Sequence, residues 1–177
     1  MDKTGFWQLI ESAKTAAPGD QQLQERALVS SLTKLQPAQI VSFECILREL
    51  LLEADHFNII AAQKILDGYV SDDTYLYFRC WLVAQGETVF TNALHNSDTL
   101  ASVIDDGYQN FEALLYVATT AFEKQTGKTE EDETFPRNIA AAQGLNYDFD
   151  SETKGEDWTE NQLPKMLPKL WKKFGVA

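Results

Sequence analysis

The sequence has few of the residues that carry redox, metal or hydrolytic chemistry. Its 177 residues include two cysteines and two histidines, and Cys45 and Cys80 lie far apart without forming a CxxC pair. We therefore expect reduced core thiols and no disulfide framework. The GxSxG, Walker, HExxH and glycine-rich dinucleotide motifs are absent too. The sequence therefore predicts no cofactor and no metal, and it indicates no class of enzyme by a catalytic motif.

Long apolar runs are also missing. No run approaches the roughly 20 apolar residues that a membrane-spanning helix needs. The first 14 residues have an early acid and an amphipathic pattern, unlike the basic and then apolar pattern of a secretory signal. We therefore expect a cytoplasmic protein with no membrane partner.

Positive charge is scarce. The chain has 15 Lys and Arg against 27 Asp and Glu, which gives a formal net charge of −12. Binding to the phosphate backbone of nucleic acids relies on clustered Lys and Arg, so no nucleic-acid partner is expected. A basic protein is the partner that fits this charge, and solubility alone is the alternative explanation. The chain itself is expected to be a monomer or a weak homo-oligomer.

What the sequence does contain is helical periodicity. Apolar residues recur at spacings of three and four from residue 2 to residue 125, and no convincing strand is present. The strongest predicted helix begins after Ser71 as N-cap, has Asp72 and Asp73 in its first turn, and ends at Gly86. Its inward stripe contains Tyr75, Phe78, Trp81 and Leu82. The pattern predicts an all-α fold, a compact single-domain bundle of about six to eight helices.

The remaining helices are expected around this central one. They cover residues 2–17, 20–35, 37–54, 58–67, 87–94, 98–105 and 108–125. Glu44 and Arg48 are four positions apart, and we predict that they form a surface pair. His56 is expected at a helix C-terminus and His95 in a solvated loop, with roles as a metal ligand and as a base the respective alternatives.

The C-terminal third differs from the rest of the chain in composition and in apolar periodicity. Residues 128–157 contain nine acids and three bases without clear periodicity, and they are predicted to form an acidic surface loop with a turn of helix at 138–143. Residues 158–177 again contain many apolar side chains, and this segment is predicted to pack back on the body. Pro168 is expected in the first turn of a short final helix that docks Trp171 and Phe174.

The acidic segment has a partial resemblance to a calcium-binding loop. Asn146, Asp148, Asp150 and Glu152 alternate, and Asp157 stands where such a loop has its closing carboxylate. Ser151 occupies the position that needs Gly, and the closing Asp is shorter than the usual Glu. A calcium site therefore stays open only as an alternative to a solvated loop.

Four polar residues lie in the central helix or directly after it. Asp72, Asp73, Arg79 and Glu87 are predicted to lie at the mouth of a pocket, where they could supply acid/base or metal-binding chemistry. The structural alternative is that the first-turn acids only stabilise the helix, by about 0.3–1 kcal/mol each. Arg79 would then pair with a buried acid or an aromatic face.

The helix and its flanks resemble a known family. The features that carry the resemblance are Phe6-Trp7, Gly68 before Ser71-Asp72-Asp73, Phe78-Arg79-Cys80-Trp81-Leu82, Gln85-Gly86, Asn96-Ser97-Asp98-Thr99-Leu100 and the terminal LPKLWKKFG. They are similar to the bacterial family catalogued as domain of unknown function 4240. The resemblance covers nearly the whole chain except residues 128–154. It implies a compact, mainly helical bacterial domain and names no activity.

Three functions fit the sequence. We favour a helical binding or regulatory module, because the characteristic residues serve packing and no complete catalytic group is present. The second is an acidic inhibitor or immunity-like protein that neutralises a basic partner through electrostatic attraction. The third is a small hydrolase or transferase that uses Asp72, Asp73, Arg79 and Glu87.

Overall fold

The structure is a computed structural model, and it describes residues 1–105, 108–147 and 152–175. Over these residues it contains ten α-helices and three 3₁₀ helices, and the β pairing within them is one isolated bridge between His56 and Lys154. The all-α prediction is confirmed. The helices outnumber the predicted six to eight because the C-terminal third contributes short helices that are too brief to show a full apolar repeat.

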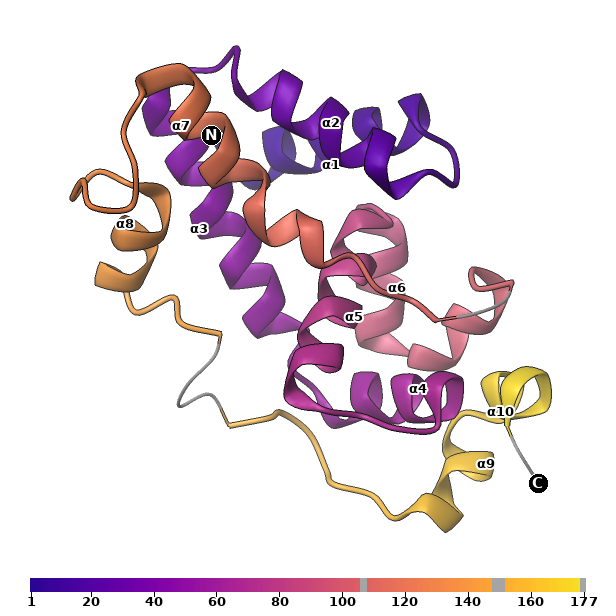
Figure 1. Cartoon of the computed structure of the whole chain (residues 1–177). Helices are drawn as coiled ribbons and strands as arrows, with labels where there is room; N and C mark the ends of the chain where they lie inside the picture. Colours follow the sequence, from indigo (N-terminus) through magenta and orange to yellow (C-terminus); the bar gives the residue numbers. More distant parts are fainter. Residues whose placement is uncertain (106–107, 148–151, 176–177) are drawn as a thin grey trace.

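The helices follow the chain as labelled in Figure 1. Their bounds are α1 (Lys3–Ala16), α2 (Gln21–Leu32), α3 (Pro37–Glu53), α4 (Phe57–Asp67), α5 (Asp72–Ala84), α6 (Glu87–His95), η1 (Ser97–Ser102), η2 (Glu112–Tyr116), α7 (Val117–Thr126), α8 (Pro136–Ala142), η3 (Glu160–Gln162), α9 (Leu163–Met166) and α10 (Pro168–Phe174).

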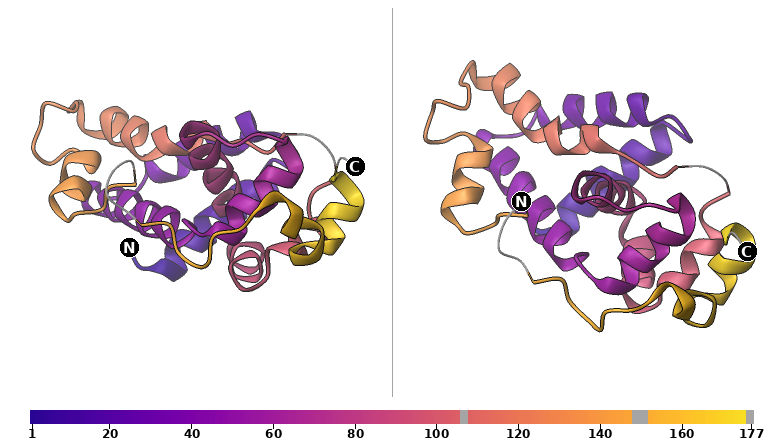
Figure 2. Two further views of the ribbon diagram at one scale, coloured as in Figure 1. Left: turned by 90° about the horizontal axis from the view of Figure 1, so that it is seen from below. Right: turned by 60° about the horizontal axis from the view of Figure 1, so that its bottom comes forward.

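Helix α5 is the centre of the fold. It contacts α1, α3, α4, α6 and η2, and Figure 2 shows the other helices arranged around it. Ser71 caps it by accepting from the Thr74 amide at 3.3 Å, as the sequence predicted. Phe78 is fully buried and stacks on Trp81 with 5.5 Å between the ring centroids. Two buried aromatic rings on one helix face supply a large apolar area, so neighbouring helices pack against this stripe.

Residues 108–125 do not form the single helix that the sequence predicted. The amide of Phe111 donates to the carbonyl of Tyr77 at 3.1 Å, and the Asn110 side chain accepts from the Glu112 amide at 3.0 Å. These bonds hold the segment before Glu112 in a non-helical conformation along α5. A 3₁₀ turn, η2, and then α7 follow.

His56 begins a helix, whereas the sequence analysis placed it at a helix C-terminus. Its ring Nδ1 accepts from the Asn58 amide at 3.2 Å, so it is the N-cap of α4. Helix α3 has already ended at Glu53. The Tyr75 hydroxyl accepts from the His56 amide at 2.9 Å and donates to the Ala54 carbonyl at 3.0 Å, which stabilises the turn between the two helices.

The segment 128–157 contains a packed helix. The predicted turn at 138–143 is α8, which contacts α3 and α7 and lies beside α3 in Figure 1. Phe135 at its start is buried and meets Phe122 edge-on at 5.9 Å. At the far end of the segment, the Lys154 amide donates to the Asp55 carbonyl at 3.0 Å. Asp148, Asp150 and Ser151 of the possible calcium loop lie outside the described residues.

The predicted surface pair of Glu44 and Arg48 is buried, so that prediction was wrong. Arg48 Nε donates to Glu44 Oε1 at 2.7 Å, and the two side chains are 8% and 2% exposed. Helix α8 and the residues after it cover this side of α3. Arg48 donates to the Leu145 carbonyl at 3.0 Å, and its guanidinium carbon lies 4.7 Å from the centroid of the Tyr147 ring. Local spacing identified the pair, but only the covering segment decides its burial.

The C-terminal helix docks on the body, as predicted. Leu163, Leu167 and Leu170 are buried, and α10 packs against η1 and α4. The buried carboxylate of Asp98 accepts from the amides of Lys169 and Leu170, each at 2.9 Å. Asp98 is therefore a helix cap supplied by a residue about 70 positions away in the sequence, which fixes where α10 sits.

We predict that Asp98→Ala releases the N-terminus of α10. The free energy of unfolding should fall by about 2 kcal/mol, because hydrogen bonds to a charged acceptor contribute about 1.5–3 kcal/mol. Chemical denaturation measures the loss, and hydrogen exchange should accelerate at the amides of Lys169 and Leu170.

The control for Asp98 is Asp105→Ala, which removes an exposed carboxylate 3.5 Å from Lys173 Nζ. An exposed ion pair contributes about 0–1 kcal/mol, so little change is expected. Equal losses for the two variants would show that Asp98 does not hold the tail.

The buried Glu44 carboxyl should give a pH-dependent contribution to stability. Burial raises its pKa above the ordinary value of 4.5, and Arg48 partly opposes the rise. The folded chain then binds the proton more tightly than the unfolded chain, so this contribution falls as the pH rises through the raised pKa.

Comparison with Glu44→Gln isolates that contribution. The free energy of unfolding of the natural chain minus that of the variant should decrease as the pH rises above about 4.5. Denaturation at a series of pH values measures the difference, and Glu49→Gln, at an exposed position of the same helix, controls for the lost charge. A difference that increases with pH would contradict the burial argument.

Candidate functional site

The acids of the predicted pocket lie at opposite ends of α5. Asp72 and Asp73 are exposed in the first turn of α5, and Glu87 is exposed in the first turn of α6. At 1.5 Å per residue, the helix between them is about 18 Å long. The structure therefore does not bring Glu87 to the two aspartates.

Arg79 lies in the interior between α5 and α3. It is 5% exposed, its guanidinium donates to the Leu51 carbonyl at 2.9 Å, and its central carbon is 4.5 Å from the centroid of the Tyr75 ring. The aromatic contact is one of the structural alternatives that the sequence left open. A cation beside the carbonyls of the last turn of α3 is also favourable with the helix dipole. Arg79 therefore connects two helices and does not face Asp72, Asp73 or Glu87 across a pocket.

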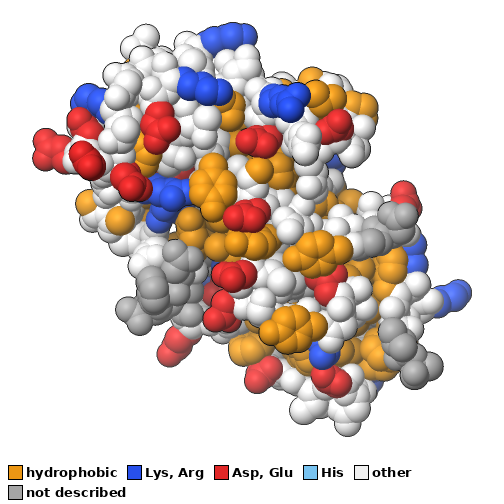
Figure 3. Space-filling view, in the orientation of Figure 1, with side chains coloured by type: hydrophobic (Ala, Val, Ile, Leu, Met, Phe, Trp, Pro, Cys, Tyr) orange, Lys and Arg blue, Asp and Glu red, His pale blue; other side chains and the backbone are white. Residues whose placement is uncertain are grey.

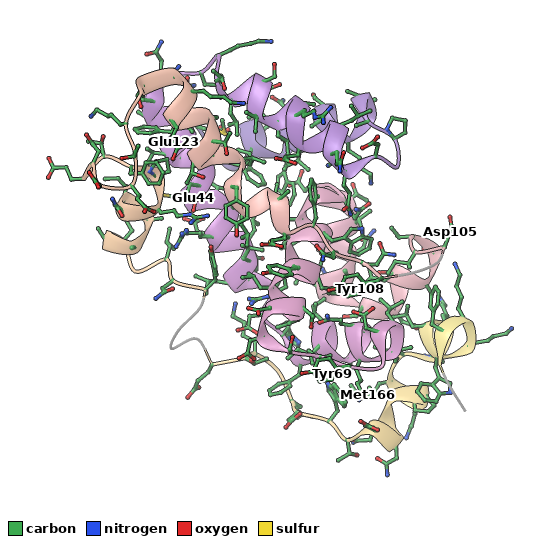
Figure 4. All side chains as sticks on the ribbon, in the orientation of Figure 1. Glu44, Tyr69, Asp105, Tyr108, Glu123 and Met166 are labelled. Atoms are coloured by element: carbon green, nitrogen blue, oxygen red, sulfur yellow. The ribbon has the colours of Figure 1, made fainter. Side chains whose placement is uncertain are left out.

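A different group of residues forms an exposed surface. Among the described residues the large hydrophobic side chains with the greatest exposure are Tyr69 at 68%, Tyr108 at 54%, Leu23 at 47% and Tyr116 at 43%. In Figure 4, Tyr69 lies in front of α4 and Tyr108 just above that helix. Figure 3 shows aromatic side chains separated by acids across this same face. Exposed tyrosines are therefore concentrated on one side of the molecule.

Acidic side chains lie between these tyrosines. The Tyr116 hydroxyl donates to Glu112 Oε1 at 3.2 Å. Desolvation, followed by the charges of Glu112 and Asp73, raises the pKa of the half-buried Tyr77. A phenol hydroxyl can donate a hydrogen bond to a partner. We call Tyr69, Asp73, Tyr77, Tyr108, Glu112 and Tyr116 together the tyrosine face.

The tyrosine face is built on well-packed elements. Tyr77 projects from α5, and its carbonyl accepts from the Phe111 amide, which ties η2 to that helix. The Arg137 guanidinium lies 5.1 Å from the centroid of the Tyr116 ring and donates to the Leu115 carbonyl at 3.2 Å. Tyr77 and Tyr116 are therefore held in position before any partner arrives.

Sequence reasoning missed most of this surface. It gave no role to Tyr69, Tyr108 or Tyr116. A signal was available, since Tyr69 and Tyr108 each follow a glycine between predicted helices and Tyr116 falls outside the apolar spacing of its segment. An aromatic residue off the periodic stripe is a candidate for exposure.

The cysteines and histidines do not gather into a site. Cys45 and Cys80 are buried free thiols, and burial raises the pKa of both. His95 is exposed at the end of α6 with a ring nitrogen 2.8 Å from the Thr91 carbonyl. Within the described ranges no three His, Cys, Asp or Glu side chains are grouped closely enough to hold a metal ion. None of the helices described combines the length and apolar character needed to cross a bilayer.

Comparison with curated proteins and with solved structures found no match. One family model does match, that of a protein of unknown function, DUF4240, and it covers residues 1–124. The matched part contains Phe6-Trp7, the whole of α5 and Asp98, whereas α8, α9 and α10 fall beyond it. Because the match spans most of the chain, the protein belongs to the DUF4240 family.

Proposed function

We propose that this protein is a binding module whose tyrosine face binds a basic protein partner. The observation that carries the proposal is the concentration of exposed Tyr69, Tyr108 and Tyr116 around the carboxylates of Asp73 and Glu112. No small pocket or catalytic group is needed for this role.

Tyrosine suits such a surface for a physical reason. Its ring contributes a large contact area with few rotatable bonds, and its hydroxyl pairs with polar groups of the partner, so tyrosines are enriched among the residues that dominate binding energy. Tyr77 packs against the core and the Arg137 guanidinium contacts the Tyr116 ring, so these two rings lose little further freedom on binding.

Charge supports a basic partner. The acids on the face pair with Lys or Arg of a partner, while the net charge of −12 attracts a basic protein over a longer range and raises its association rate. An inhibitor that neutralises a basic protein is one form of this function. The hydrolase or transferase alternative has less support, because Arg79 is engaged in the interior and Glu87 lies far from Asp72 and Asp73.

The test is capture of partners from a lysate of the source organism, followed by reconstitution with the purified partner. The triple variant Tyr69→Ser, Tyr108→Ser and Tyr116→Ser should weaken binding by at least about 30-fold, because each hot-spot tyrosine contributes about 2 kcal/mol or more and the effects are not additive. Affinity for the natural chain should also fall as salt rises.

Leu23→Ser is the matched control, since Leu23 is 47% exposed but lies on α2, outside the tyrosine face. It should change affinity by less than about twofold. The double variant Asp73→Asn and Glu112→Gln should slow association and flatten the salt dependence. Equal capture by the natural chain and the triple variant would refute the proposal, as would a partner that binds without any salt dependence.

A further inference from the structure

We propose that the groove between α2 and α7 binds an acidic, extended segment of a partner protein. The two helices contact each other, and the groove along them has a volume of about 400 Å³. Its charged wall residues are Glu25, Arg26, Lys34 and Lys124, so bases outnumber acids in the wall. None of the residues that line it belongs to the tyrosine face. The groove is therefore a second surface, of opposite charge to the first.

The three bases of the groove have no acidic partner. Within the residues that the structure describes, the side chains of Arg26, Lys34 and Lys124 form no ion pair and no hydrogen bond. Elsewhere, exposed Lys128 has Asp132 at 3.1 Å. Figure 3 shows Lys and Arg side chains at the top of the molecule, over α2 and α7. In a chain with 27 acids and 15 bases, three unpaired bases around one groove give a local excess of positive charge.

Positive charge is greatest at one end of the groove. Gln125, near the end of α7, donates to the carbonyls of Thr33 and Leu35, just beyond the end of α2. The C-terminal ends of the two helices therefore lie together, and Lys34 and Lys124 belong to this end. The helix dipoles favour cations there, so the two lysines stabilise the helices while their ammonium groups remain free for an anion.

The acid in the wall fixes where the charge of a ligand is tolerated. Glu25 lies one turn or more before the lysine end of α2, next to Arg26 in the sequence, and it disfavours an anion there. An acidic ligand should therefore place most of its charge against Lys34 and Lys124. The net charge of −12 repels such a ligand at a distance, but a Debye length of about 8 Å at physiological salt confines that repulsion.

The spacing of the wall residues matches an extended chain. Arg26, Ser30 and Lys34 follow one another at intervals of four residues, which places them on one side of α2 about 6 Å apart. The helical turn continues to Lys34, whose amide donates to the Ser31 carbonyl at 3.2 Å. Alternate side chains of an extended segment are about 6.6 Å apart on one side. Acidic side chains two and four residues apart can therefore lie opposite successive wall residues, whereas one small anion reaches only one end.

The uncharged wall residues suit the same ligand. The hydroxyls of Ser30 and Thr120 form no hydrogen bond within the described part of the chain, so each can donate to a carboxylate. The Thr33 hydroxyl already donates to the Val29 carbonyl at 2.7 Å and keeps only its acceptor capacity. Val29 is buried and supplies an apolar contact for the backbone and the side-chain stems of the segment.

The experiment is titration of the full chain with a capped octapeptide of alternating Glu and Ser. The backbone amide resonances of Ser30, Thr33, Thr120 and Lys124 are followed by NMR. They should shift saturably at low salt, with a dissociation constant of about 1 mM or lower that rises as salt is added. The same octapeptide with Gln in place of Glu should give no saturable shift.

A pair of charge-reversal variants tests the groove. Lys34→Glu with Lys124→Glu should raise the dissociation constant by about tenfold or more, because repulsion replaces attraction at the most positive end. The control is Lys165→Glu with Lys172→Glu, which changes the net charge equally on α9 and α10, far from α2 and α7 in Figure 1. It should alter the constant by less than about twofold. All four lysines are exposed, and unchanged melting temperatures show that both variants are folded.

The proposal is overturned if the octapeptide gives no saturable shift at these amides, or if the control variant weakens binding as much as the groove variant. Tighter binding of inorganic phosphate at the same amides would identify a small-anion site. Tighter binding of an oligothymidylate of equal length would identify a nucleic-acid surface, and either result also overturns the proposal.

Discussion

Burial of the aromatic stripe of α5 is the interaction on which the rest of the structure depends. Phe78 and Leu82 are fully buried and Trp81 is nearly so, and five other elements pack against this helix. Burying a large aromatic or aliphatic side chain stabilises a fold by about 1.5–3 kcal/mol, so this helix contributes more than local propensity does. The position of α5 also decides where the tyrosine face lies, since Tyr77 is on its partly exposed outer side.

Buried polar groups determine how the C-terminal third attaches. Asp98 caps α10, Arg48 reaches the Leu145 carbonyl, and the Asp55 carbonyl accepts from the Lys154 amide. A buried polar group is costly unless it is paired, so each of these contacts favours one placement of the later segment. The residues beyond the family match are thus held by residues within it.

The tyrosine face presents rings and acids outward, where a large partner can cover them. The acidity of the chain favours a basic partner at this surface.

The sequence by itself determined the fold class, most helix starts and the docked final helix. Asp2, Asp20 and Ser71 cap helices through side chains three residues from the amides they satisfy, and the apolar spacing of α5 is local as well. Such signals act within one or two turns, so they can be interpreted without the rest of the chain.

Tertiary structure alone decided the environment of the polar and aromatic residues that lie off those stripes. Glu44 and Arg48 have the spacing of a surface pair, but α8 covers them, and Arg79 turned inward because the last turn of α3 offered a carbonyl. Tyr69 and Tyr108 came to lie on one side of the molecule only when their separate segments packed around α5. Burial is set by whatever lies opposite a residue in space, and for these residues the opposite surface comes from segments dozens of positions away in the sequence.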